Sequence, residues 1–340
     1  MPRKKPMMAM AIDPDDDGPS ENLEASMAFT AGGSLKCHEF RMNGIGMVSG
    51  IPFEEIVLGK ELGRGASSTV YKGEARGNLV AVKQLSNVND KELRKQLCAE
   101  MQFLKDHLKD DPCVHLVTIY DAYYVDEMTY IVLEFCPGGA LDDCIAAHGA
   151  ASEPCLAVIM RQIMFGLTHL YNKKIVHRDM KPANCLVTED GVVKISDFGS
   201  SKQGEQLEGG MAETFTGTTR YMSPERLQGD KYSWPADVWC AGMIMLELAF
   251  ADHPYKIAFG EDGSFMAMIE NSKKETPQLP DEYSDEARDF ANLCLAKDPS
   301  QRPPPPEVVN QNSPTDSHPW VVKWMECSNE VVVEWLAVTK

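Results

Sequence analysis

Three short strings of charged and polar residues constrain this chain more than any other feature. They are His177-Arg178-Asp179-Met180-Lys181-Pro182-Ala183-Asn184, then Asp197-Phe198-Gly199, then Ser223-Pro224-Glu225. The first two strings lie among short apolar runs that are typical of strands. Charges in loops between buried strands are costly unless they have partners or a use, so packing alone does not explain the pattern. The strings therefore predict a site that carries chemistry.

A glycine-rich stretch, Gly63-Arg64-Gly65-Ala66-Ser67-Ser68-Thr69-Val70, joins two predicted strands, 55–59 and 69–73. Glycine lets backbone N–H groups close over phosphate oxygens. Taken alone the stretch also suits an ordinary turn, and Ser68 stands where a third glycine is usual. The stretch lacks the Gly-Lys-Ser/Thr ending of a P-loop, which argues against that class of nucleotide-binding protein.

Strands come first along the chain and helices follow. Residues 79–83 complete a hairpin that turns at Arg76-Gly77-Asn78, and residues 130–135 form a further strand. Beyond Pro137-Gly138-Gly139 the pattern is mostly helical. This order predicts an α+β fold, with a small antiparallel sheet lobe on a larger helical lobe.

Two helices can be placed from their spacing and end signals. Apolar residues recur at helical intervals from Leu93 to Leu104, and Glu100 lies on the flank of that apolar face. A second helix begins with Ser152 as its cap and Pro154 at its first position, and it runs to about residue 172. The first helix is expected to turn Glu100 toward the sheet.

The strings, in this order behind a glycine-rich strand and a lysine on the next strand, resemble the motifs of protein kinases. The resemblance implies a bilobal kinase fold that binds ATP and Mg²⁺. Asp179 is then the catalytic base, which accepts the proton of the attacking hydroxyl, and Lys181 neutralises charge on the transferred phosphoryl. Lys83, paired with Glu100, holds the ATP phosphates.

The same resemblance assigns the metal ligands and two supporting residues. Asn184 offers an amide oxygen and Asp197 a carboxylate, and both are hard donors that suit Mg²⁺. His177 is expected to pack inside the fold, and Arg178 to hold a loop.

A nucleotide pocket follows from the positions of the glycine-rich stretch and the strands. Leu133 is expected at the back of the adenine site, and the backbone of Glu134 and Cys136 is expected to bond the adenine edge. Cys185, next to the catalytic string, could be a nucleophile, but its apolar neighbours favour a buried, inert thiol. The expected nucleotide contacts are Leu62, Gly63, Gly65, Ser68, Val70, Ala81, Lys83, Leu133, Glu134, Cys136 and Leu186.

The second half of the chain narrows the family. Residues 211–227 include Tyr221-Met222-Ser223-Pro224-Glu225-Arg226 and resemble the activation segment of MAP kinase kinases. Gly32-Gly33-Ser34-Leu35 resembles a lead-in seen in plant and protist members of that family. Asp237-Val238-Trp239 resembles the start of the helix beneath the catalytic loop, and Arg302 resembles the arginine that pairs with Glu225. The resemblance implies a dual-specificity kinase that phosphorylates Thr and Tyr in a MAP kinase and is itself activated by an upstream MAP kinase kinase kinase.

The activation segment also departs from that family. Family members carry two phosphorylated Ser/Thr sites; Thr214 matches the second, Thr216 is its close competitor, and Gly209-Gly210 occupies the place of the first. Two alternatives stay open. One is a related Ser/Thr kinase with another substrate, and the other is a pseudokinase scaffold, against which the retained catalytic residues argue.

Charge and cysteine content bound the partners and the compartment. The formal net charge of −18 disfavours nucleic acid and anionic membranes. Ten cysteines are scattered without a Cys-x-x-Cys pair, which indicates reduced thiols and a cytoplasmic protein. The longest apolar run, residues 238–250, is too short to span a bilayer and indicates a buried helix.

The predicted boundaries are 1–50, 53–136, 137–322 and 323–340. The first region is rich in acid, Pro and Gly and is expected to lack regular structure. Its start, Arg3-Lys4-Lys5 followed by spaced apolar residues, suits a MAP kinase docking peptide, although an ordinary start or a nuclear-import patch fits too. The last region could form a further helix or cover the helical lobe.

Overall fold

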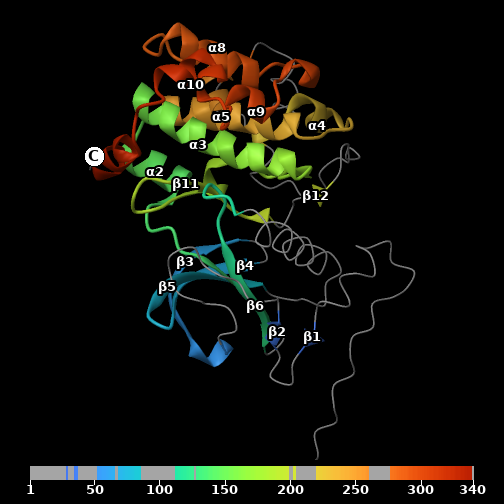
Figure 1. Ribbon diagram of the computed structural model, residues 1–340, viewed down its shortest axis with the longest axis vertical. Helices are drawn as coiled ribbons and strands as arrows, with labels where there is room; N and C mark the ends of the chain where they lie inside the picture. Colours follow the sequence, from blue (N-terminus) through green and yellow to red (C-terminus); the bar gives the residue numbers. More distant parts are fainter. Residues whose placement is uncertain are drawn as a thin grey trace, which may run out of the picture.

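The computed structural model forms a sheet lobe, here the N-lobe, and a larger helical lobe, here the C-lobe (Figure 1). This confirms the predicted α+β fold. The structure describes residues 28–29, 34–36, 52–65, 68–85, 112–125, 128–198, 202–203, 220–259 and 276–338.

The N-lobe is a seven-stranded antiparallel sheet in the order β1-β2-β6-β7-β5-β4-β3. The predicted hairpin turns at Arg76 and Gly77, whose φ angles of 49° and 79° lie in the left-handed region that such tight turns need. Its main strands are β3 (Ile56–Arg64), β4 (Ser68–Ala75), β5 (Asn78–Leu85), β6 (Ile119–Val125) and β7 (Met128–Glu134), preceded by the short 3₁₀-helix η1 (Phe53–Glu55).

Two further strands lie in the region that was expected to lack regular structure. They are β1 (Ala28–Phe29) and β2 (Ser34–Lys36), and β2 pairs with β6 through Ser34 opposite Tyr123. The prediction is therefore wrong for these residues. A strand at a sheet edge has unpaired backbone groups that recruit a partner, and local composition does not reveal such a partner. The basic residues 3–5 lie outside the described residues.

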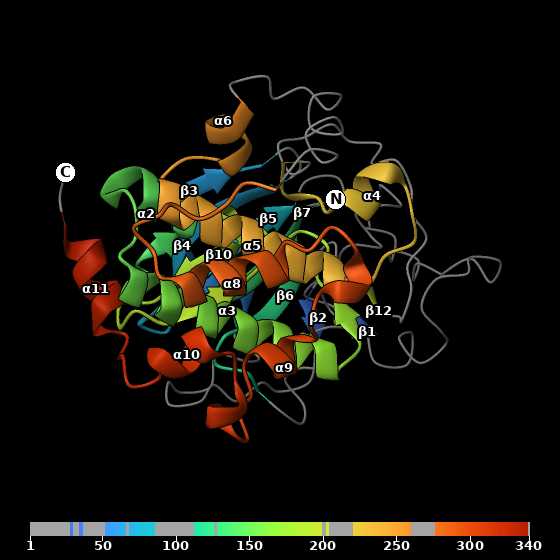
Figure 2. The same ribbon diagram turned by 90° about the horizontal axis from the view of Figure 1, so that it is seen from above.

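The C-lobe is built on two long helices, α3 and α5, which lie at its centre (Figure 2). Its helices are α2 (Leu141–His148), α3 (Glu153–Asn172), α4 (Pro224–Gln228), α5 (Pro235–Phe250), α6 (Pro254–Phe259), α8 (Asp285–Cys294), α9 (Pro305–Val308), α10 (Pro319–Lys323) and α11 (Glu330–Ala337), with 3₁₀-helices η2 (Pro182–Asn184), η5 (Pro299–Gln301) and η6 (Pro314–Asp316). Its short strands are β8 (Gly139–Ala140), β9 (Ile175–Val176), β10 (Cys185–Val187), β11 (Val193–Ile195) and β12 (Lys202–Gln203).

Helix α5 is buried along almost its whole length, as predicted. Helix α3 packs against α5 on one side and against β11 on another, where a Cβ on Gly166 would come within 2.7 Å of Ile195. Among the described residues, no helix combines the length and the apolar character needed to cross a membrane. The two helices thus form the base on which the short strands of the site rest.

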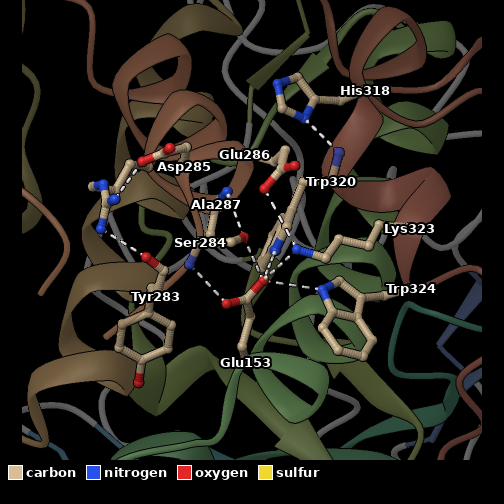
Figure 3. Close-up of polar contacts among 11 residues, drawn as sticks. Glu153, Tyr283, Ser284, Asp285, Glu286, Ala287, His318, Trp320, Lys323 and Trp324 are labelled. Atoms are coloured by element: carbon tan, nitrogen blue, oxygen red, sulfur yellow. Dashed lines mark hydrogen bonds and ion pairs between the residues drawn. The ribbon is translucent and has the colours of Figure 1, made fainter. Parts of the chain in front are cut away.

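The start of α3 differs from the prediction in detail. Ser152 occupies the cap position, but its side chain makes no capping hydrogen bond, and Pro154 is the second helical residue. The first helical residue, Glu153, instead turns its carboxylate to α8 and α10 (Figure 3). Oε1 accepts from the Ser284 hydroxyl at 2.5 Å and from the Trp320 and Trp324 indoles at 3.1 and 3.2 Å. Oε2 accepts from the Ser284 N–H at 2.8 Å.

The C-terminal region is part of the C-lobe, so the predicted boundary at residue 322 is misplaced. Helix α10 crosses that boundary, and Arg161 of α3 donates to the carbonyls of Trp324, Met325 and Cys327 at 2.8–3.1 Å. Helix α11 then lies beside α2 and α3 (Figures 1 and 2). Both predicted alternatives apply to residues 323–340, because this region forms the helix α11 and that helix covers part of the helical lobe.

The Glu153 carboxylate predicts a pH-dependent contribution to stability. Burial opposes its ionisation, but the hydrogen bonds from Ser284 and the two indoles lower its pKa below 4.5. A carboxyl whose pKa is depressed by folding stabilises the fold above its unfolded pKa and loses this contribution as the pH falls through the folded value.

Glu153→Gln should therefore lower the free energy of unfolding at pH 7 by roughly 2 kcal/mol. In thermal unfolding followed by circular dichroism, the difference from wild type should shrink below pH 4.5. The exposed Glu282→Gln is the matched control. A difference that stays constant down to pH 3 would contradict this role.

Candidate active site

The first catalytic string forms a loop that α5 holds in place. Asp237, in the first turn of α5, accepts the backbone N–H of His177 at 2.7 Å and that of Arg178 at 2.9 Å. Arg178 has a φ of 74°, a left-handed conformation that costs an L-residue free energy. The two hydrogen bonds hold the loop in that conformation, and Asp179 follows directly.

The Asp179 carboxylate has one occupied oxygen and one that is available. Oδ2 accepts from Lys181 Nζ at 2.9 Å and from Asn184 Nδ2 at 3.0 Å. Oδ1 is buried and has no hydrogen-bond partner within the described part of the chain. A buried acceptor without a partner is costly in a resting protein, so it suits a group that accepts a proton from a substrate. The structure thus brings together Asp179, Lys181 and Asn184 as predicted.

Asn184 and Asp197 have the donor atoms that a magnesium site needs. Asn184 uses its Nδ2 on the Asp179 backbone carbonyl at 2.7 Å, which leaves its amide oxygen as the group able to coordinate a cation. Burial alone would raise the pKa of Asp197, but the charge and hydrogen bond of Lys83, with weaker help from other cations, lower it. An ionised carboxylate and an amide oxygen are ligands that Mg²⁺ prefers, so these residues fit the ion.

Lys83 projects from β5 to Asp197, the first residue of the Asp-Phe-Gly string. Its Nζ lies 2.7 Å from Asp197 Oδ1, and this ion pair connects the N-lobe with the C-lobe. Asp197 has a φ of 63°, so its backbone is also held in the left-handed region. The predicted partner of Lys83, Glu100, lies outside the described residues together with its helix.

The two strands that flank the glycine-rich stretch extend further into it than predicted. Strand β3 continues through Leu62 and Gly63, and β4 begins at Ser68. The N–H of Gly65 donates to the Ser68 carbonyl at 2.7 Å, which closes a tight turn. Across the sheet Val70 stands opposite Gly63 on one side and Lys83 on the other. The predicted phosphate-side residues therefore lie on neighbouring strands.

The other side of the predicted pocket is formed by the segment that joins the lobes. Ala81 stands opposite Leu133 in the sheet. After the end of β7 the chain passes close to β10 at Gly138. The N–H of Gly138 donates to the Val187 carbonyl at 2.9 Å, and a Cβ on Gly138 would lie 2.8 Å from that oxygen. Leu186 pairs with Ala140 at this point. A side chain at position 138 would separate this segment from β10.

Two backbone and thiol details refine the prediction. The N–H of Glu134 already donates to the Thr118 carbonyl at 2.8 Å, so it is not available to a nucleotide in this state. Cys136 is buried, and burial raises the pKa of its thiol to about 12. Cys185 is fully buried, as predicted, and burial raises the pKa of its thiol to about 12.

His177 packs inside the fold and Arg302 pairs with Glu225, as the sequence predicted. The sequence did not predict that Tyr232 is a partner of Arg178. His177 is buried and its ring Nε2 lies 3.0 Å from the Ser196 carbonyl. Arg302 binds both oxygens of Glu225 at 2.7 and 2.9 Å inside the C-lobe. Arg178 Nε donates to the Tyr232 hydroxyl at 2.8 Å, a contact 54 residues away that no local pattern indicates. Gly199, Thr214 and Thr216 lie outside the described residues.

Comparison with known proteins agrees with this geometry. Residues 56–313 match the protein kinase domain family. Mitogen-activated protein kinase kinase 1c of Physcomitrium patens is 32% identical over 91% of this chain and 93% of its own length. Mitogen-activated protein kinase kinase 2 of Arabidopsis thaliana is 32% identical over 81% of this chain and 74% of its own. Mitogen-activated protein kinase kinase kinase 2 of Arabidopsis thaliana is 33% identical over 77% of this chain but only 40% of its own.

The fold and the site define an ATP-dependent protein kinase, which confirms the predicted class of enzyme. Within that class, the chain belongs to the mitogen-activated protein kinase kinase family.

The available oxygen of Asp179 predicts the effect of its removal. Asp179→Asn keeps the shape and loses the proton acceptor, so turnover should fall by on the order of a hundredfold or more, with little change in nucleotide affinity. Steady-state kinetics and titration with Mg-ADP measure the two quantities. The exposed Asp281→Asn is the control. Near-normal turnover in the Asp179→Asn variant would remove Asp179 from the role of base.

Proposed function

We propose that this kinase transfers the γ-phosphoryl group of ATP to Thr and Tyr in the activation loop of a MAP kinase. The observation that carries the transfer chemistry is Oδ1 of Asp179, next to Lys181, which is buried and without a hydrogen-bond partner among the described residues. The choice of protein substrate is supported by the names of the two kinase kinases that match most of this chain.

Each residue of the site has a step in this reaction. Asp179 Oδ1 orients the substrate hydroxyl and accepts its proton as oxygen attacks the γ-phosphorus in line. The bond from the γ-phosphorus to the bridging oxygen breaks, and ADP leaves with that oxygen. Lys181 offsets the negative charge that develops on the transferred group, and Lys83 contacts the phosphates of ATP. Asn184 and Asp197 would hold Mg²⁺, which supplies positive charge to the phosphate oxygens.

A phosphosite map tests the substrate. We expect purified MAP kinases, made inactive so that they do not phosphorylate themselves, to gain phosphate on both Thr and Tyr of the activation loop when incubated with this enzyme and Mg-ATP. The Asp179→Asn variant is the matched negative control. Phosphate on Thr alone, or on other proteins only, would favour the related Ser/Thr kinase. No transfer to any substrate, with retained nucleotide binding, would favour the pseudokinase scaffold.

We also propose that an upstream MAP kinase kinase kinase activates the enzyme by phosphorylating Thr214 or Thr216. A phosphate adds nearly two negative charges and strong acceptor oxygens. Arg178, directly beside the base, is a cation that such a group can bind, and its side chain already donates to the hydroxyl of Tyr232 in the segment between α4 and α5. With Gly209-Gly210 in place of a first site, one phosphate must supply most of the ordering.

Thr214→Ala should give a folded enzyme that binds ATP but does not respond to the upstream kinase, whereas Thr214→Glu should be partly active because a carboxylate carries less charge than phosphate. Thr216→Ala is made in parallel. Activity after treatment with the upstream kinase is measured for all three. Normal activation of Thr214→Ala together with loss in Thr216→Ala would move the site to Thr216.

The N-terminal residues Arg3-Lys4-Lys5 are proposed as a docking peptide for the MAP kinase, because their cations and the apolar residues that follow suit an acidic groove with small pockets. The scattered cysteines support a cytoplasmic location.

A further inference from the structure

An ion pair between a buried lysine and a glutamate whose side chain is 20% exposed connects the two lobes beside the proposed nucleotide site. Lys194 Nζ lies 2.9 Å from Glu134 Oε1, and the lysine side chain is 9% exposed. Glu134 ends β7 in the N-lobe sheet, whereas Lys194 is the middle residue of β11 in the sheet formed by β11, β10 and β8. Glu134 and Lys194 are called the hinge pair below.

A third segment fixes the carboxylate of the hinge pair. Glu134 Oε2 accepts the N–H of Thr118 at 3.1 Å, while the Glu134 N–H donates to the Thr118 carbonyl at 2.8 Å. The carboxylate therefore has both oxygens engaged, and a rotation of the side chain breaks two contacts. The ammonium group of Lys194 therefore pairs with a carboxylate whose position on the N-lobe is fixed.

The hinge pair is not needed to keep the lobes together. The Val117 N–H donates to the Ile195 carbonyl, and the Ile195 N–H donates to the His115 carbonyl, both at 2.9 Å. A buried ion pair adds little net stability over apolar residues of similar volume, because desolvation of the charges offsets their attraction. It does favour one relative position of the elements that carry the charges, since any other position leaves a buried charge unpaired.

The two elements of the hinge pair lead to opposite ends of the nucleotide site. Glu134 is followed by the segment through Cys136 that is expected to bind adenine. Lys194 is followed three residues later by Asp197, which Lys83 contacts at 2.7 Å. An error in the spacing of these two ends would prevent ATP from contacting both at once.

We infer that Glu134 and Lys194 are positioning residues that set the distance between the adenine-binding segment and the metal-binding Asp197. The inference rests on the proposed ATP site and adds to it a determinant of nucleotide affinity. It concerns binding of the nucleotide, so it predicts a change in KM for ATP rather than in the chemical step.

Single substitutions remove charge and keep shape. Glu134→Gln retains an acceptor for the Thr118 N–H, and Lys194→Met retains the length of the stem. Each should raise KM for ATP by about tenfold and leave kcat at saturating ATP within about threefold, with no change in KM for the protein substrate. Lys194→Arg keeps the charge and should stay near wild type. Arg76→Met, which breaks an exposed pair with Glu55, is the control.

The double variant Glu134→Gln/Lys194→Met separates positioning from stability. Glu134→Gln leaves the buried Lys194 charge without its partner and should unfold at a lower temperature, while Lys194→Met should cost less because the Glu134 side chain is 20% exposed. The double variant leaves neither charge and should recover the wild-type unfolding temperature. It should nevertheless keep the raised KM. Recovery of both quantities would overturn the inference, as would a wild-type KM in every variant.

Titration with Mg-ADP gives the same comparison as dissociation constants, without turnover. A wild-type enzyme that binds Mg-ADP but transfers no phosphoryl group would overturn the proposed function alone. The order of the dissociation constants among the variants would still decide the role of the hinge pair.

Discussion

The carboxylate of Asp237 is the group on which the geometry of the catalytic loop depends. It is buried at the start of α5 and accepts two backbone N–H groups, those of His177 and Arg178. Burial raises the pKa of Asp237, while these hydrogen bonds and the nearby His177 and Arg226 act against that rise. The left-handed backbone at Arg178 costs on the order of 1–3 kcal/mol, and hydrogen bonds to a charged acceptor supply about that amount each. Asp179 directly follows these two anchored residues, so its position is fixed as well. One of its carboxylate oxygens, Oδ1, has no hydrogen-bond partner among the described residues.

The same loop also contacts the segment around Asp197, the proposed metal ligand. His177 contacts the Ser196 carbonyl through its ring and packs edge-on against Phe198, with ring centroids 5.4 Å apart. Asp197 lies between these two contacts, which explains how its left-handed backbone is maintained. Lys83 then reaches it from the N-lobe. Asp179 and Asp197, the proposed base and the proposed metal ligand, are therefore positioned by one continuous set of contacts that begins at α5.

Sequence reasoning succeeded where a few neighbouring residues determine the geometry. Asp179, Lys181 and Asn184 lie within six residues, so their spacing largely fixes their mutual contacts. It failed where partners are distant in the chain. Nothing near Glu153 indicates the indoles of Trp320 and Trp324, and nothing near Glu134 indicates Lys194.

Edge pairing was missed for a related reason. The pairing of β2 with β6 consists of backbone contacts, and the composition of residues 1–50 as a whole, which is rich in acid, Pro and Gly, predicts no strand there. The C-terminal boundary was misplaced because α10 and α11 are short helices whose apolar residues do not by themselves show which surface they cover. Their place becomes clear only when Arg161 is seen to bind the carbonyls of Trp324 and Cys327. In both cases the deciding groups belong to the backbone, which a side-chain pattern does not describe.

The activation segment is fixed at both ends, and this limits how it can be controlled. At its start β12 pairs with β9, next to the catalytic loop. At its end the Tyr221 hydroxyl donates to Glu247 at 2.7 Å, and Glu225 is bound by the buried Arg302. Moving the second end would break the buried pair of Glu225 and Arg302. We therefore propose that the charge of a phosphate added between these ends is met by cations of the C-lobe. Arg178 is one such cation, and it directly precedes Asp179 in the chain.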